Sequence, residues 1–117
     1  MPTARQRGRL VYKVSILPVA KRDLEEIVRY LSDDLRSPDT AERVASAIVD
    51  GIRILSPMPY RRRAYVPIRP LGHEHRSLRA GSHLVFYWIE EHPSPSAVVA
   101  RVLYGASDAR NRLGRED

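Results

Sequence analysis

The last third of the chain, residues 76–113, constrains the fold most, because its pattern predicts three consecutive strands. The pair Ala80-Gly81 suits a tight turn between the first two strands, since glycine adopts a positive φ without steric cost. The middle strand has two apolar faces, with Leu84, Phe86 and Trp88 on one and Val85, Tyr87 and Ile89 on the other. Two apolar faces indicate a sheet that is covered at least partly on each side.

A turn rich in proline and serine at residues 90–96 leads to the third strand, which ends at Tyr104-Gly105. Strict alternation divides this strand into two faces, Val98, Ala100 and Val102 against Val99, Arg101 and Leu103. Because Arg101 is a cation inside an apolar strand, we expect it to have a defined partner. The carboxylate of Asp108, or one from another protein, would serve.

Apolar residues recur at three- and four-residue spacing over residues 19–35, which predicts an amphipathic helix. A second such stripe begins at Pro38, for which Ser37 is the expected N-cap, and ends at Leu55. Residues 56–59 contain two prolines, which cannot continue the helical hydrogen bonds. The short link between the two stripes predicts an antiparallel helical hairpin.

A short strand over residues 10–17 precedes this hairpin, and the small Ala45 and Ala47 favour close approach of its two helices. The predicted fold is therefore α+β. An N-terminal strand leads into an antiparallel helical hairpin that packs on a small, mainly antiparallel sheet. The C-terminal three-strand meander completes that sheet.

Composition excludes several classes of protein. A chain of 117 residues forms one domain, which we place at residues 10–117 after a basic flexible tail at residues 1–9. There is no cysteine, so disulfides, thiolate chemistry and a Cys-based zinc site are excluded. No apolar run approaches the roughly 20 residues of a membrane span, and no secretory signal begins the chain. We expect a cytoplasmic protein that has no membrane partner and needs no cofactor.

The net charge of +6 is spread unevenly along the chain. Residues 23–59 carry four basic and eight acidic side chains, giving −4, whereas residues 60–89 carry six and one, giving +5. The basic part contains an irregular stretch, residues 60–75, with four arginines: Arg61, Arg62, Arg63 and Arg69. With Tyr60 and Tyr65 they suit phosphate binding and base stacking. We favour the alternative, a solvated crossover loop whose tyrosines fold onto the domain.

His73-Glu74-His75, in the same stretch, has residue types that bind metals. Adjacent residues of an extended segment point to opposite faces, however, and no third ligand is evident. We therefore expect no metal site here.

Four segments in this order make the chain resemble the RelE/ParE superfamily of bacterial type II toxins over nearly all of residues 11–113. They are YKVSILPVAKRDLEEIVRYL, the helical hairpin that ends at Ser56-Pro57, RSLRAGSHLVFYWIE and ARVLYGASDARNRL. RelE-like members of that superfamily cleave messenger RNA in the ribosomal A site. ParE-like members poison DNA gyrase without chemistry of their own.

The resemblance is closer to the ParE-like branch. A nuclease needs cations at the scissile phosphate and a group that accepts the 2′-OH proton. RelE-like members typically carry basic residues just after the glycine that follows the last strand, where this chain has Ala106-Ser107. The resemblance thus implies a gyrase inhibitor with no catalytic residue. The alternative is a ribosome-dependent endoribonuclease whose site would use Arg79, His83, Arg101 and Arg110.

By the same resemblance, Arg79, Ser82, His83, Tyr87, Arg101 and Asp108 fall on positions shared with ParE-like toxins, and Tyr104 stands where many relatives have His. Our candidates for binding gyrase or an antitoxin are Arg61, Arg62, Arg63, Arg69, Arg79, His83, Tyr87, Arg101, Tyr104 and Asp108. For each of them, maintenance of the fold is the competing explanation.

The resemblance also implies a cognate antitoxin, a small acidic protein that wraps the toxin with its C-terminal segment and binds DNA with its N-terminal part. The toxin would then form a hetero-oligomer and meet operator DNA only through the antitoxin. The basic region over residues 60–89 offers arginines to its carboxylates. A degenerate member that only binds an antitoxin is a third possibility.

Overall fold

The computed structural model describes residues 11–67 and 69–114, with the side chains of residues 106 and 107 left out. The predicted tail, residues 1–9, lies outside the described residues. In chain order the elements are β1 (Lys13–Ile16), α2 (Pro18–Arg29), the π-helical turn η1 (Tyr30–Asp34), α3 (Pro38–Ile54), the 3₁₀ turn η2 (Pro59–Arg61), β2 (Arg76–Ala80), β3 (His83–Glu90), β4 (Ser96–Tyr104) and α4 (Gly105–Arg112).

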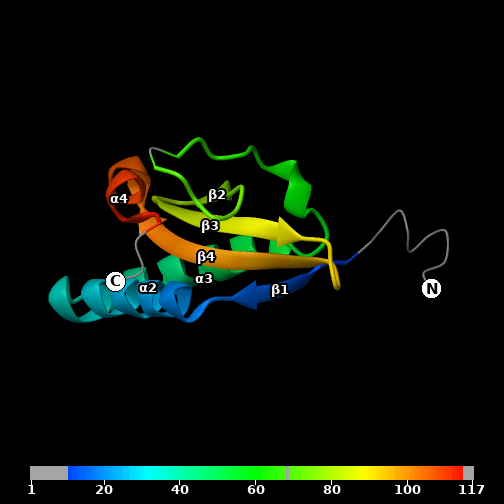
Figure 1. Cartoon of the computed structure of the whole chain (residues 1–117). Coiled ribbons are helices and arrows are strands. Elements are labelled where there is room, and N and C mark those ends of the chain that lie inside the picture. Colours follow the sequence, from blue (N-terminus) through cyan, green and yellow to red (C-terminus); the bar gives the residue numbers. More distant parts are fainter. Residues whose placement is uncertain (1–10, 68, 115–117) are drawn as a thin grey trace.

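The four strands form one mixed sheet in the order β1-β4-β3-β2 (Figure 1). β1 runs parallel to β4, and the other neighbours are antiparallel. The predicted α+β fold, with its mainly antiparallel sheet and C-terminal meander, is confirmed. The turn between β2 and β3 lies one residue later than predicted, at Gly81-Ser82, because Ala80 pairs with His83. Of the two turn residues only Gly81 has a positive φ, of 63°, as in a type II′ turn.

Strict alternation along β4 proves wrong, because the strand contains a bulge. Phe86 pairs with Arg101, but the next residue of β3, Tyr87, pairs with Val99, so Ala100 has no partner in β3. A bulge residue shifts the side chains that follow it to the opposite faces. Val99 and Val102 therefore both belong to the core under the helices, although the alternating pattern placed them on opposite faces.

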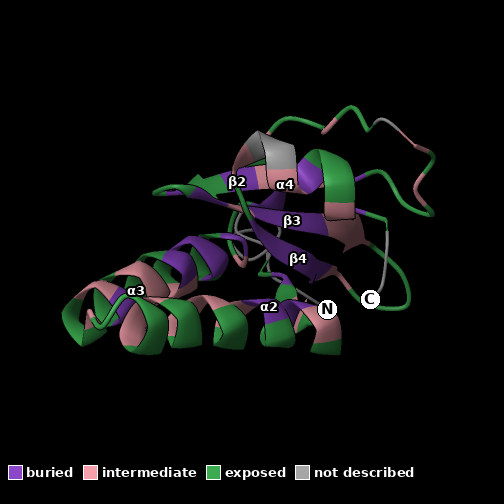
Figure 2. Ribbon diagram, turned by 90° about the vertical axis from the view of Figure 1, so that its left-hand side faces the viewer, coloured by how far each residue is buried: buried purple, intermediate pink, exposed green. Residues whose placement is uncertain are grey.

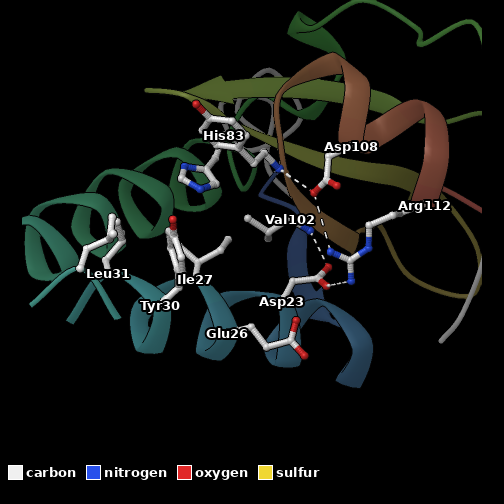
Figure 3. Close-up of a pocket in the computed structure, with 11 residues that line it drawn as sticks. Asp23, Glu26, Ile27, Tyr30, Leu31, His83, Val102, Asp108 and Arg112 are labelled. Atoms are coloured by element: carbon white, nitrogen blue, oxygen red, sulfur yellow. Dashed lines mark hydrogen bonds and ion pairs between the residues drawn. The ribbon is translucent and has the colours of Figure 1, made fainter. Parts of the chain in front are cut away.

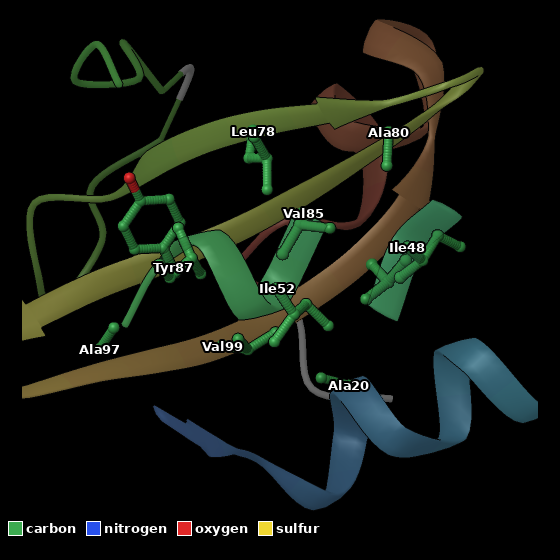
Figure 4. Packing of buried hydrophobic residues seen from close by; sticks show 11 residues of the cluster. Ala20, Ile48, Ile52, Leu78, Ala80, Val85, Tyr87, Ala97 and Val99 are labelled. Atoms are coloured by element: carbon green, nitrogen blue, oxygen red, sulfur yellow. The ribbon is translucent and has the colours of Figure 1, made fainter. Parts of the chain in front are cut away.

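α2 and α3 form the predicted antiparallel hairpin and cover one face of the sheet (Figures 1 and 2). Their core joins the two helices to all four strands (Figure 4), through Ala20, Ile48, Ile52, Leu55, Leu78, Ala80, Val85, Tyr87, Ala97, Val99 and Val102, with Val14 at its margin. Gly51 lets α3 approach β2, since a Cβ there would lie 2.9 Å from Cδ2 of Leu78. Ala47, which we expected between the helices, is exposed instead.

Two helix ends differ from expectation. Ser37 is the N-cap residue of α3, but its hydroxyl donates to Oγ1 of Thr40 at 2.6 Å and caps no backbone N–H. The first helix ends in the π-helical turn η1, in which the N–H of Leu35 donates to the carbonyl of Tyr30. A spacing of five residues replaces the usual four at this point.

The loop and α4 cover part of the other face. Their small core consists of Phe86, Leu103, Ala109 and Leu113, with Tyr65, Leu71 and Leu84 at its margin. Tyr65 packs edge-on against Phe86 with 5.0 Å between ring centroids, as expected for a loop whose tyrosines fold onto the domain. α4 is absent from the elements predicted from the sequence. None of the helices within residues 11–67 and 69–114 is long and apolar enough to cross a membrane.

Candidate functional site

A groove of about 610 Å³ opens between the α2–η1 wall and the ends of β3, β4 and α4 (Figure 3). It is lined by Asp23, Glu26, Ile27, Tyr30, Leu31, Leu35, His83, Val102, Tyr104, Asp108 and Arg112. Three of these residues, His83, Tyr104 and Asp108, were among our candidates for target or antitoxin binding. The groove is thus the place where the structure brings predicted site residues together.

A buried ion pair between α2 and β4 lies behind the groove, which its carboxylate partner Asp23 lines. The carboxylate of Asp23 accepts hydrogen bonds from Nε and NH2 of Arg101 at 2.7 and 2.8 Å, and both side chains are at most 4% exposed. It also accepts the backbone N–H of Val102 at 2.9 Å. β1 ends at Ile16, and Leu17 makes the last bond to β4 at Val99. Beyond that point β1 no longer covers the edge of β4, and the carboxylate of Asp23 accepts the backbone N–H that β1 would otherwise bind there.

Arg112 joins α4 to this ion pair. Its guanidinium lies 3.9 Å from Asp23 and 3.7 Å from Asp108, and its carbonyl accepts a bond from NH1 of Arg101 at 3.3 Å. The carboxylate of Asp108 also accepts the N–H of Tyr104 at 3.3 Å. Among described carboxylates, then, Arg101 is bonded to Asp23 and not to Asp108, the partner suggested from the sequence.

His83 and Tyr104 form the mouth of the groove on the sheet side. They pair across β3 and β4, and their rings meet edge-on with 5.4 Å between centroids. Burial lowers the pKa of His83, against a smaller opposing effect of Asp108. The ring is therefore neutral at neutral pH and presents an apolar face with one acceptor nitrogen.

Tyr87 lies in the core and not in the groove. It is fully buried, and its hydroxyl donates to the carbonyl of Pro59 at 2.5 Å. Burial raises the pKa of this hydroxyl. In this arrangement Tyr87 ties β3 to the start of the loop, which is a structural task.

The predicted arginines are spread over the surface and do not line the groove. Arg61 and Arg63 are exposed, while Arg62 is half-buried and its carbonyl accepts a bond from Arg76 at 2.5 Å. Arg69 donates to the carbonyls of Arg110 and Leu113 at 3.2 and 2.9 Å, so it holds the end of α4.

Arg79 and Ser82 are exposed at the hairpin of β2 and β3, where Arg79 donates to the carbonyl of Gly81 at 3.4 Å. Arg110 is exposed on α4. Of the four residues proposed for an alternative nuclease, only His83 lines the groove.

The two histidines of the loop pack on Trp88. The ring of His73 stacks on it with 3.9 Å between centroids, and His75, which is buried, meets it edge-on at 5.4 Å. Nδ1 of His75 lies 2.8 Å from the carbonyl of His73. Within the described part of the chain, no three His, Cys, Asp or Glu side chains are grouped so that they could hold a metal ion.

Several groove residues were not predicted from the sequence. Tyr30 was not singled out, and Leu31 and Leu35 were assigned to the stripe that packs on the sheet. Asp23 gave the clearest signal. It follows Ala20 by three residues and precedes Ile27 by four, so it is a carboxylate on the apolar side of a helix. Such a residue requires a buried partner, and the cation in β4 also required one.

Comparisons with known proteins agree on the fold. Residues 14–109 match the sequence model of the family described as "ParE toxin of type II toxin-antitoxin system, parDE". A structure titled "Chromosomal ParDE TA system from P. aeruginosa" superposes with a TM-score of 0.64 at 13% identity, over 81% of this chain and 97% of that one. The toxin–antitoxin complex RelBE2 from Mycobacterium tuberculosis gives 0.57 at 24% identity, over 81% and 99%. No curated protein sequence matches the chain.

Proposed function

The chain belongs to the ParE family of toxins of type II toxin–antitoxin systems, and from this premise we propose that it inhibits DNA gyrase by binding it. The family match confirms the resemblance to the ParE-like branch. In this proposal the protein binds its target and has no catalytic residue of its own. Gyrase works on the chromosome, so the proposal also places the toxin in the cytoplasm.

The observation that carries the proposal is the position of Arg101. A nuclease of this fold would need a cation that can reach a scissile phosphate. The side chain of Arg101 is 4% exposed, and its guanidinium donates to both carboxylate oxygens of Asp23. Releasing it would leave a buried carboxylate unpaired, which costs about 3–5 kcal/mol. In this protein Arg101 therefore supports the fold.

The other cations near the groove give little support to a ribonuclease. Arg112 is the one arginine or lysine among the described residues that line it, and its guanidinium faces Asp108 and Asp23. His83 has the neutral ring of a proton acceptor, but no uncommitted described cation in the groove accompanies it. Binding, rather than phosphodiester cleavage, is what this combination favours.

A supercoiling assay tests the proposal. Purified toxin, titrated against purified gyrase with relaxed plasmid and ATP, should abolish supercoiling. The same toxin added to a translating extract should leave messenger RNA uncut in the ribosomal A site. Normal supercoiling together with A-site cleavage would refute the proposal in favour of the endoribonuclease alternative. In that case, substituting His83→Ala should abolish cleavage while the fold persists.

A cognate antitoxin belongs to the same proposal. Both similar structures are titled as toxin–antitoxin systems or complexes, and by analogy this toxin is neutralised by a partner protein in a hetero-oligomer. Arg61, Arg63 and Arg79 are exposed and available to carboxylates of such a partner. Supercoiling should therefore recover when the product of an adjacent small reading frame is added to the assay.

A further inference from the structure

A separate cavity of about 360 Å³ lies beneath the loop and shares no lining residue with the groove. Five segments of the fold meet around it: the start of α2, the loop, β3, β4 and the end of α4. It is lined by Leu17, Val19, Pro70, Leu71, Gly72, His73, His75, Trp88, Ala100, Arg101, Leu113 and Gly114. A cavity of this size with a mainly apolar lining and a few polar groups is typical of a small-molecule site.

The surroundings of this cavity favour an anion, since none of its described lining residues is acidic. Arg101 lines the cavity whereas its partner Asp23 lines the groove, so their ion pair turns its positive side to the cavity. Arg101 stays bonded to Asp23 and acts on the cavity through its charge. α2 also begins here, at Leu17 and Val19, and its first turn has neither a side-chain cap nor an acidic residue. The N–H groups and the dipole of this helix end attract negative charge.

The end of α4 does little to oppose this effect, although the C-terminus of a helix is its negative end. Arg69 donates to the carbonyls of Arg110 and Leu113, and Arg101 donates to the carbonyl of Arg112. Guanidinium groups therefore already bind the carbonyls on this side of the cavity.

Aromatic rings form another part of the lining. The ring of His73 lies flat on Trp88, with 3.9 Å between centroids and an angle of 4° between the planes. The face of this indole therefore already accepts a heteroaromatic ring. His75 meets the same indole edge-on. Nucleobases stack on rings of this kind.

His75 adds a hydrogen-bond acceptor to the cavity, although the residue is only 6% exposed. Its Nδ1 lies 2.8 Å from the carbonyl of His73 and so carries the proton. Burial lowers the pKa of His75, which leaves the ring neutral at neutral pH. Nε2 is then an acceptor, and it makes no hydrogen bond with a residue of the described chain. An amino group or hydroxyl of a ligand can donate to it.

We propose that this cavity binds a nucleotide, with the phosphate at the start of α2 and the base against the aromatic rings and Nε2 of His75. A nucleotide combines the three features that the lining selects, which are an anion, a flat ring and a hydrogen-bond donor. Two sources offer this chemistry, a free nucleotide and the terminal nucleotide of a DNA strand. The inference goes beyond gyrase inhibition and does not depend on it.

The test follows the fluorescence of Trp88, the single tryptophan of the chain. Adenosine monophosphate, adenosine and inorganic phosphate are titrated in turn into the full-length protein. Adenosine monophosphate should change the emission saturably and bind at least about tenfold more tightly than either half, because the joined halves lose translational freedom only once. Absence of saturation up to about 10 mM, beyond the weakest specific affinities, would overturn the proposal. Equal binding of adenosine would overturn it too.

Gly72 allows the sign of the charge to be tested. It is exposed, lines the cavity, and a Cβ added there would meet no atom within 4 Å. Gly72→Glu should weaken adenosine monophosphate several-fold by repelling the phosphate, whereas Gly72→Lys should bind it at least as tightly as the unsubstituted protein. Ser82→Glu, which adds the same negative charge at the hairpin of β2 and β3, outside the cavity, should change nothing. Equal weakening by Gly72→Glu and Gly72→Lys, or full affinity in Gly72→Glu, would overturn the proposal.

A single-stranded oligodeoxynucleotide with a 5′-phosphate distinguishes the two sources. If it displaces adenosine monophosphate at a lower concentration than the free nucleotide does, the ligand is the end of a DNA strand, and the reverse order assigns a free nucleotide. The supercoiling assay keeps the two proposals apart. If no nucleotide binds but gyrase is inhibited, only the cavity proposal fails, and if nucleotide binds but gyrase is not inhibited, only the proposed function fails.

Discussion

Two carboxylates at opposite ends of β3 and β4 each tie distant segments together, but in opposite surroundings. Asp23 joins α2 to β4 through Arg101 and the N–H of Val102, with a side chain that is 3% exposed. Glu91 is exposed just beyond β3 and accepts the hydroxyls of Tyr12, at 2.9 Å, and of Tyr60. One junction is an ion pair in the interior, and the other is a charged group at the surface held by neutral donors.

The difference shows what burial demands of a charge. At the surface, water solvates whatever part of Glu91 the tyrosines leave free, so neutral donors suffice. In the interior, water does not solvate the carboxylate of Asp23, so this carboxylate needs a cation that binds it with good hydrogen-bond geometry. The two junctions should therefore respond very differently when one partner is removed.

The largest effect is expected for Asp23→Ala. Arg101 would remain buried without its carboxylate, and we expect a loss of about 3–5 kcal/mol in the free energy of unfolding. Urea denaturation followed by circular dichroism measures it. Glu25→Ala, at an exposed carboxylate on the same helix, should stay within about 0.5 kcal/mol. A loss below 1 kcal/mol for Asp23→Ala would mean that burial is not what separates the two junctions.

Removing both charges sharpens the comparison. In Asp23→Asn combined with Arg101→Met, the amide oxygen still accepts the N–H of Val102, and no charge is left buried. We expect this double variant to lose only about 1–2 kcal/mol, less than Asp23→Ala alone. Equal losses in the double variant and in Asp23→Ala would indicate that packing, and not the unpaired charge, dominates.

At the surface junction, Glu91→Ala should cost about 1 kcal/mol or less. The hydroxyls of Tyr12 and Tyr60 lose an acceptor, but water can replace it at this exposed position. The same denaturation experiment measures the loss. A cost as large as that of Asp23→Ala would erase the contrast between the two carboxylates.

A last prediction concerns the dependence of stability on alkaline pH. Burial, and then the bond to Glu91, raise the pKa of Tyr12 from 10.0 to about 12. Between these values the unfolded chain loses the Tyr12 proton while the folded chain keeps it. The stability contributed by this proton is thus fully present below pH 10 and is lost as the pH rises toward 12. A titration of tyrosinate absorbance should show one late-titrating hydroxyl fewer in Tyr12→Phe than in the unsubstituted protein, while Tyr60 and Tyr87, whose pKa values are also raised, still titrate late. An unchanged number of late-titrating hydroxyls in that variant would contradict the assignment.

Much of the fold follows from the sequence because its signals are local. Apolar residues at helical spacing, such as Leu24 and Ile27 in α2 or Ile48 and Ile52 in α3, predict a helix whatever that helix packs against. α4 was not predicted because only Ala109 and Leu113 pack from this segment onto the sheet, and two apolar residues are too few to form a recognisable stripe. The bulge escaped for a different reason, since a single unpaired residue depends on the pairing with β3 and leaves no trace in the alternating pattern.

The candidate site was predictable in part. His83, Tyr104 and Asp108 were reached through the family resemblance, and Arg101 through its charge. The α2–η1 wall of the groove could not be predicted as part of the site. Apolar residues in a helix have the same spacing whether they face the core or a partner protein. The π-helical turn then places Leu35 where an α-helical count would not.

The unpaired Ala100 also bears on how this chain should be aligned with its relatives. Deleting it would leave Val99 opposite Tyr87 and Arg101 opposite Phe86, as they are now, and every later side chain would keep its face. A relative one residue shorter in this strand should therefore carry its gap at Ala100. Such a relative would lose the extra local twist that a bulge introduces. Its counterpart of Arg101 would then leave the sheet at a different angle, and the acid that meets it need not occupy the position of Asp23.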